Sequence, residues 1–187
     1  MDHDRCSRLL AKAKRSPKAE KLLGFLNRSG KDGANKVSLL CKECSTEGPE
    51  GGARAYFASP PHMMVVCHNR VHDEKEIETA VVHELIHAVD YVARDMNLGN
   101  CKMLACSEIR AARGSECSKQ YLTHAELLFM KLDAFRSKGF QYNCVQEQAV
   151  RATEAIFPKE ARGCVVEMMG KCYEDKVGFQ TFPDDGE

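Results

Sequence analysis

The chain has 187 residues, of which 43% are hydrophobic and 29% are charged; this composition excludes a disordered or fibrous protein and fits one domain, or one domain with a small appendage. Lys and Arg together number 27, as do Asp and Glu, so the formal net charge is zero and gives no reason to expect direct contact with nucleic acid. No stretch approaches the roughly 18 consecutive apolar residues of a transmembrane helix, so any membrane contact is expected to be peripheral.

Residues 1–31 form a basic segment, with nine Lys or Arg against three acidic residues. Residues 5–28 are predicted to be helical, with a break or a second helix start at Pro17. A basic amphipathic start is typical of a transit peptide, a membrane-surface helix or a solvated surface helix. Asp2 and Asp4 argue against a transit peptide, and no apolar core of a secretory signal follows. We assign residues 1–36 to a basic helical N-terminal segment.

Three short apolar runs follow and predict strands at 37–41, 53–58 and 63–67, separated by segments rich in Gly and Pro. Three short strands in succession predict a small antiparallel sheet. The third run has two interpretations. It is either an edge strand that aligns a peptide substrate by pairing, or a buried core strand.

From Asp73 onward the pattern is helical almost throughout. Asp73 followed by Glu76 resembles a capping box that begins a helix, which we expect to run to about residue 97. Further helices are predicted near 103–113, 122–138, 144–157 and 160–173, and a flexible tail at 180–187. The predicted fold class is therefore α+β, with a small sheet followed by a helix-rich region, and the main domain covers residues 37–179.

Ten cysteines are many for a chain in a reducing compartment and indicate an oxidising one, although a reduced chain with buried thiols is the alternative. Their number is even, and no pairing can be assigned from sequence. Cys41 and Cys44 have the CxxC spacing of half a zinc knuckle or a redox pair. Because no second CxxC exists, we expect disulfides at these two positions.

The motif that carries chemistry is His83-Glu84-Leu85-Ile86-His87, a His-Glu-x-x-His sequence. Residues four apart lie on one face of a helix, so both imidazoles can bind one zinc ion. Glu84 lies about 100° around the helix, where it can reach a water at the metal without displacing a ligand. The motif predicts a metallopeptidase in which Glu84 is the general base.

The surroundings of this motif strengthen the prediction. On a helical wheel, only one narrow face is polar, and it carries His83, His87 and Asp90. Two imidazoles and two carboxylates on an otherwise apolar helix are costly without a partner. The rest of the circumference is apolar: Ile77, Val81, Val82, Leu85, Ile86, Ala88, Val89, Val92 and Ala93.

A catalytic zinc needs a third protein ligand. A metzincin would have a histidine six residues after His87, where this chain has Ala93, so that class is excluded. Glu108, 21 residues past His87 on the next predicted helix, is our first choice. Asp90 is the rival; on the same helix as His87, it is the better candidate for a hydrogen-bond acceptor that orients an imidazole.

Other polar residues have weaker assignments. Arg110 is expected to pair with a carboxylate, in a surface salt bridge or otherwise, or with the substrate. Tyr121 and His124 are candidates for oxyanion stabilisation by residue type alone. His68 and His72 are four apart but lack the intervening Glu, and are interpreted as ordinary polar residues.

The sequence resembles the mitochondrial inner-membrane protease family called ATP-twenty-three over roughly residues 37–179. One departure is Val89, which stands where the resemblance leads us to expect an aromatic residue; this concerns packing rather than chemistry. The resemblance rests on His83 to Asp90, on Ala105-Cys106-Ser107-Glu108-Ile109-Arg110-Ala111, and on Cys144-Val145 with Cys172-Tyr173-Glu174-Asp175.

The resemblance implies a zincin-like metalloendopeptidase with one zinc ion. It implies a location in the mitochondrial intermembrane space, peripheral to the inner membrane. The implied partner is the precursor of a membrane-embedded ATP synthase subunit, which the enzyme would process while also assisting assembly of the membrane sector. The alternative is a non-proteolytic assembly chaperone, or a partner of the Ku DNA-repair protein, in which zinc is mainly structural.

Overall fold

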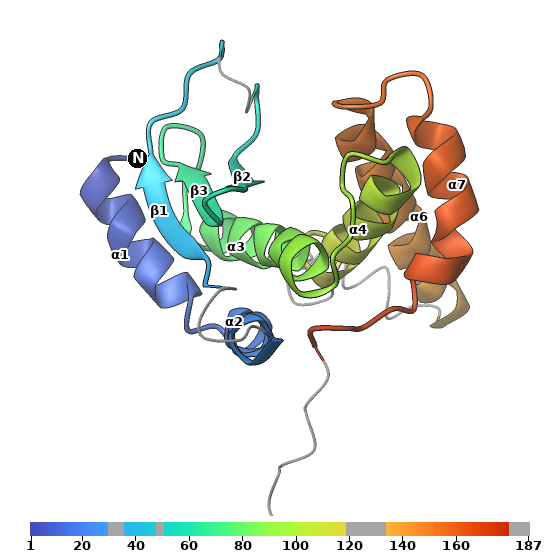
Figure 1. Cartoon of the computed structure of the whole chain (residues 1–187), viewed down its shortest axis with the longest axis horizontal. Coiled ribbons are helices and arrows are strands. Elements are labelled where there is room, and N and C mark those ends of the chain that lie inside the picture. Colours follow the sequence, from blue (N-terminus) through green and yellow to red (C-terminus); the bar gives the residue numbers. More distant parts are fainter. Residues whose placement is uncertain (30–35, 48–50, 119–133, 180–187) are drawn as a thin grey trace, which may run out of the picture. The chain divides into compact units, whose positions relative to one another are not determined.

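Three strands form one mixed sheet (Figure 1). The computed structural model describes residues 1–29, 36–47, 51–118 and 134–179. Strands β1 (Ser38–Lys42), β2 (Ala55–Ala58) and β3 (Met63–Cys67) lie in the order β1-β3-β2, with β3 parallel to β1 and antiparallel to β2. The three strands are confirmed, but the all-antiparallel sheet is wrong. After β1, the chain crosses to the other edge of the sheet and forms β2 before it returns to form β3. No hairpin therefore joins β1 to β3, and without a hairpin their pairing need not be antiparallel.

The central strand of this sheet is β3. It pairs on both edges, and its residues 64–67 are buried. The interpretation of 63–67 as an edge strand is therefore wrong, and the buried core strand is confirmed. The edge position antiparallel to β3 belongs to β2.

Two N-terminal helices precede the sheet. In α1 (His3–Ala13), the Asp2 carboxylate caps the helix by accepting from the Arg5 amide at 2.7 Å. Pro17 begins α2 (Pro17–Ser29), where its missing N–H costs nothing. The predicted second helix start is thus confirmed. Both helices pack against α3 (Glu74–Ala88), and α1 also packs against β1.

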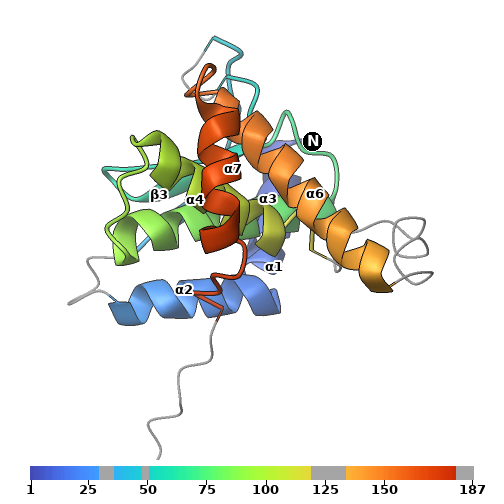
Figure 2. The same ribbon diagram turned by 90° about the vertical axis from the view of Figure 1, so that its right-hand side faces the viewer.

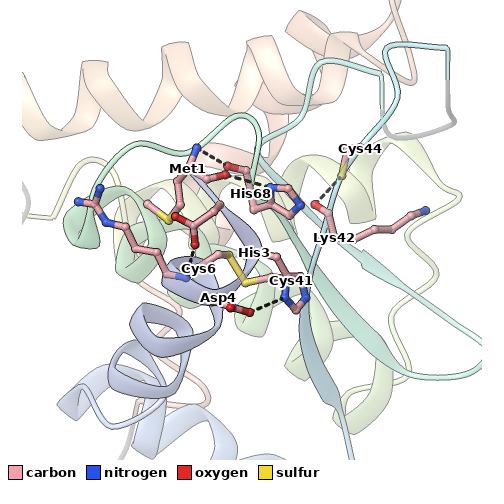
Figure 3. The surroundings of a disulfide bond; sticks show 10 residues. Met1, His3, Asp4, Cys6, Cys41, Lys42, Cys44 and His68 are labelled. Carbon is pink, nitrogen blue, oxygen red and sulfur yellow. Dashed lines mark hydrogen bonds and ion pairs between the residues drawn. A yellow bond between two sulfur atoms is a disulfide. The ribbon is translucent and has the colours of Figure 1, made fainter.

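Two disulfides hold the ends of the sheet. Cys6 of α1 is bonded to Cys41 of β1 (Figure 3). Cys44 is bonded to Cys67 of β3. Beside the first bond, the terminal ammonium of Met1 donates to the His68 carbonyl oxygen at 3.1 Å. The disulfides predicted at the CxxC positions are confirmed, and each cysteine bonds to a distant partner rather than to the other.

The described chain divides into two units, Met1–Asp95 with Lys176–Glu187, and Met96–Asp175. The N-terminal helices belong to the first unit, since α1 is bonded to β1 and both helices pack on α3. The domain boundary after residue 36 stays a prediction. The predicted tail at 180–187 lies outside the described residues. Within the first unit, Gly178 has a φ of +90°, and a side chain there would crowd Leu22 and Val89.

The second unit contains the helices α4 (Cys101–Gly114), α6 (Ala134–Glu154) and α7 (Ala161–Cys172). Figure 2 shows α6 and α7 side by side, and both pack on α4. Three disulfides connect the unit: Cys101–Cys164, Cys106–Cys172 and Cys117–Cys144. Its apolar core comes mainly from small and sulfur-containing side chains of these helices.

Helices predicted near 103–113 and 160–173 are confirmed. The helix predicted at 122–138 falls mostly outside the described residues. The expected interruption between 138 and 144 is absent, because α6 runs through it to Glu154 without a Pro in that stretch. The helix expected to reach residue 97 ends as a π-helical turn, η2 (Val89–Ala93). In the described ranges, no helix combines the length and apolarity needed to cross a bilayer.

Lys18 of α2 makes the free energy of unfolding depend on pH. Burial lowers its pKa from 10.5 to about 8, against an opposing effect of the Glu78 carboxylate. The unfolded chain therefore binds more protons than the folded chain between about pH 8 and 10.5, so Lys18 destabilises the fold below pH 8, and this penalty disappears as the pH rises through that window.

We predict that Lys18→Met is more stable than the wild type at pH 7, and that its advantage shrinks by pH 9.5. The side chain is only partly buried, so the change should be less than about 1 kcal/mol. Urea unfolding of both proteins at the two pH values measures it. A difference that is independent of pH would contradict the assignment.

Candidate metal centre

The helix α3 begins at a capping box. The Asp73 carboxylate accepts from the Glu76 amide at 2.8 Å, and the Glu76 carboxylate accepts in turn from the His72 amide at 2.8 Å. The predicted start of the helix is confirmed. This fixed first turn sets which side chains of the His-Glu-x-x-His motif share a face two turns later.

The motif lies in the most buried part of α3. His83 is partly exposed, whereas Glu84 and His87 are each 8% exposed. The two imidazole rings lie with their centroids 4.8 Å apart and their planes at 74°. The predicted shared face is therefore present, with both imidazoles beside each other on an otherwise apolar helix.

Asp90 follows the motif in the π-helical turn and is completely buried. Its carboxylate accepts from the guanidinium of Arg94 at 3.1 Å, and the Arg94 side chain is 27% exposed. A fully buried carboxylate is costly without a partner, and the Arg94 guanidinium supplies one. The hydrogen bond with Arg94 thus accounts for a carboxylate at this position.

Glu108 lies on α4, which begins at Asn100, whose side chain accepts from the amides of Lys102 and Met103. The Glu108 side chain is 7% exposed. Two disulfides, at Cys101 and Cys106, bond the first part of α4 to α7. The helix that carries Glu108 is therefore covalently attached to its neighbour.

A buried ion pair continues this attachment. Arg110 is 2% exposed, and its Nε lies 3.5 Å from Oδ2 of Asp175. Burial lowers the pKa of Arg110, and the Asp175 carboxylate raises it. One turn further on, Arg113 stacks on the Tyr173 ring at 4.9 Å and donates to the Tyr173 carbonyl oxygen. Pairing of Arg110 with a carboxylate, one of its expected roles, is confirmed, but the pair is buried rather than a surface salt bridge.

Within the described ranges, His83, His87 and Glu108 form a group that could hold a metal ion. Two imidazole nitrogens and one carboxylate oxygen form a donor set that suits zinc. Asp90, the rival carboxylate, is not in this group.

Other candidates have different outcomes. Tyr121 and His124, the proposed oxyanion residues, lie outside the described residues. His68 is a polar structural residue, because its Nδ1 lies 3.1 Å from the Met1 carbonyl oxygen. Tyr91 was not predicted from the sequence as a site residue. It lies four residues beyond His87 and so continues the helix face that carries His83 and His87, here called the metal face; this spacing was the available signal.

The Arg110–Asp175 pair gives a test of how α4 is held. We predict that Asp175→Asn lowers the free energy of unfolding by about 3 kcal/mol, because it leaves a buried guanidinium without its carboxylate. Glu167→Gln is the control, since it breaks the exposed pair between Glu167 of α7 and Lys102 of α4 and should change little. Urea unfolding compares the two variants. Equal losses would show that burial of the pair is not what matters.

Comparison with known proteins extends the resemblance. A model of the peptidase M76 family matches residues 4–180, which includes the N-terminal helices. The mitochondrial inner membrane protease ATP23 homologs of Xenopus laevis, Danio rerio and Homo sapiens are 32%, 30% and 28% identical to the chain. The matches cover 90%, 90% and 94% of the chain, but only 68%, 63% and 69% of these relatives. No solved structure matches.

Proposed function

Because the chain belongs to the peptidase M76 family and is therefore a metallopeptidase, we propose that it is a zinc-dependent endopeptidase with a zincin-like fold. The observation that carries the proposal is the group formed by His83, His87 and Glu108. We propose that these three residues hold one zinc ion, with both histidines neutral. When bound, zinc acts as a Lewis acid that polarises a carbonyl group and makes water more acidic.

Glu84 is the proposed general base. Its carboxylate lies about 100° around α3 from His83, next to the metal face, and is 8% exposed. It accepts a proton from the attacking water on a carboxylate oxygen and passes it to the leaving amine. Burial of the residues around it excludes bulk water from that transfer.

The edge of β2 is the proposed place for the substrate backbone. The Cys67 amide donates to the Arg54 carbonyl oxygen at 2.8 Å, so this pair is hydrogen-bonded. Antiparallel pairs alternate, and in this register the backbone groups of Ala55 and Phe57 turn away from β3. An extended peptide can pair with them as an added strand. Since β2 packs against α3, this edge lies next to the metal helix.

The biological setting is proposed from the relatives. They are named as mitochondrial inner membrane proteases. We propose that this protein also acts in the mitochondrion, in the intermembrane space, peripheral to the inner membrane. Five disulfides within the chain support an oxidising compartment. The proposed substrate is the precursor of a membrane-embedded ATP synthase subunit, with a further role in assembly of the membrane sector.

Glu84→Gln tests the mechanism. We predict that it lowers the rate of cleavage of the precursor by about 10²- to 10⁴-fold, because an amide cannot accept the proton. Zinc content, measured by atomic emission, should stay at one per chain, since Glu84 is not a ligand. Glu74→Gln, a change to an exposed carboxylate on the same helix, should leave the rate unchanged.

Two outcomes would contradict the proposal. Full activity of Glu84→Gln would remove Glu84 as the base. Absence of cleavage by the wild type, together with rescue of ATP synthase assembly by Glu84→Gln in cells, would favour the non-proteolytic role.

The third ligand is tested by removing each carboxylate in turn. We predict that Glu108→Ala weakens zinc binding by at least about tenfold, because it removes one of three protein ligands. Asp90→Ala should instead lower the free energy of unfolding by a few kcal/mol, because it leaves the Arg94 cation without its buried partner. Equilibrium dialysis against zinc and urea unfolding separate the two effects. Loss of zinc in Asp90→Ala with retention in Glu108→Ala would reverse the assignment.

A further inference from the structure

Three aromatic rings meet where the end of β2 approaches the end of the metal helix. Phe57 belongs to β2, His62 to the turn between β2 and β3, and Tyr91 to the π-helical turn after α3. The ring centroids lie 5.9 Å apart for Phe57 and Tyr91, 6.3 Å for Phe57 and His62, and 6.4 Å for His62 and Tyr91. We call these three residues the aromatic cluster.

The rings of the aromatic cluster contact one another, but one of them is exposed to solvent. The Phe57 and His62 rings are nearly parallel, at 25°, and Tyr91 is tilted against both. The Oγ of Ser59 lies 2.8 Å from Nδ1 of His62 and fixes that ring. Phe57 and His62 are partly buried, whereas Tyr91 is 38% exposed. An aromatic ring held among others yet facing solvent offers a surface that a further apolar group can cover.

The cluster continues the metal face of α3. His83, His87 and Tyr91 follow one another at intervals of four residues. In an α-helix, each such step overshoots a full turn by about 40°. The turn at 89–93 is wider, since the Arg94 amide donates to the Val89 carbonyl oxygen five residues back, and this reduces the drift. Tyr91 is thus about one turn beyond His87, and it is exposed, as His83 is in part.

The cluster also continues the open edge of β2. The backbone groups of Phe57 face away from β3, so a peptide residue that pairs with them lies directly opposite Phe57. Directly opposite residues in a sheet place their side chains on the same face. The side chain of that one peptide residue would therefore lie beside the Phe57 ring and the exposed ring of Tyr91.

Because the cluster adjoins both the metal face of α3 and the open edge of β2, we infer that it is a specificity subsite. It binds a large apolar or aromatic side chain of a peptide held along β2. This inference rests on the proposed function, and it names the class of substrate residue that the site prefers. Phe57 and Tyr91 supply the apolar contact. His62, fixed by Ser59, supports the Phe57 ring as a positioning residue.

Peptide binding to the zinc-loaded Glu84→Gln protein tests the inference separately from catalysis. The probes are two fluorescein-labelled peptides of equal length and charge with lysines at both ends, one with Phe at alternate positions and Ala between, the other with Ala throughout. Fluorescence anisotropy should show about tenfold tighter binding of the Phe peptide. Tyr91→Ala and Phe57→Ala should each reduce this preference at least threefold, while Tyr91→Phe retains it.

Tyr142→Ala is the matched control. Tyr142 is 39% exposed and also lies in a pair of tyrosine rings, 5.2 Å from Tyr173, but it is far along the chain from β2. This variant should keep the preference. Phe57→Leu provides a second variant with a smaller change in volume, and thermal unfolding confirms that each protein is folded.

Several results would overturn the inference. These are equal binding of the two peptides, or a preference that survives both Tyr91→Ala and Phe57→Ala. A third is unchanged peptide binding combined with weaker binding of Tyr91→Ala to phosphatidylcholine–phosphatidylglycerol vesicles, which would make the cluster a membrane contact. Failure of the proposed function has a different signature, namely wild-type and Glu84→Gln proteins that are equally unable to cleave the precursor.

Discussion

Burying imidazoles and carboxylates on an apolar helix costs free energy unless each group has a partner, and this constraint organises the protein around α3. His87 and Glu84 are almost inaccessible, and Asp90 is completely so. The Asp90 carboxylate forms an ion pair with the Arg94 guanidinium. The two imidazoles lie side by side. Two adjacent imidazoles, one of them buried, beside the buried carboxylate of Glu84 suit a bound cation, in keeping with the metallopeptidase family to which the chain belongs.

The two helices that matter to the site are held by different means. α3 is held by packing of α1, α2 and the sheet, and one disulfide, Cys6–Cys41, joins the sheet to α1. α4 is held to α7 by two disulfides, and the buried Arg110–Asp175 pair holds it to the segment that follows α7. Loop closure of this length contributes about 3 to 5 kcal/mol per disulfide, which is large beside the stability of a small domain. Covalent bonds thus substitute for the large apolar core that short helices and a three-stranded sheet cannot build.

Local signals predicted local structure well. Pro17 begins a helix, and Asp73 with Glu76 forms the predicted cap, because these effects act within one turn of chain. The expected interruption of α6 was wrong, since no local residue forces a break there. Long-range pairing was not predictable. The direction of β1 relative to β3, the disulfide partners and the meeting of Phe57 with Tyr91 each depend on residues far apart in sequence.

The sequence by itself determined the chemistry of the helix. The spacing of His83, Glu84 and His87 decides which groups share a face, because 3.6 residues per turn is a local property of the backbone. The tertiary structure alone decided what surrounds that face. It made β2 rather than β3 the edge strand, paired Asp90 with Arg94, and brought the aromatic cluster to the end of the metal helix. These outcomes depend on how the elements pack, and packing is set by the sum of contacts between segments distant in sequence.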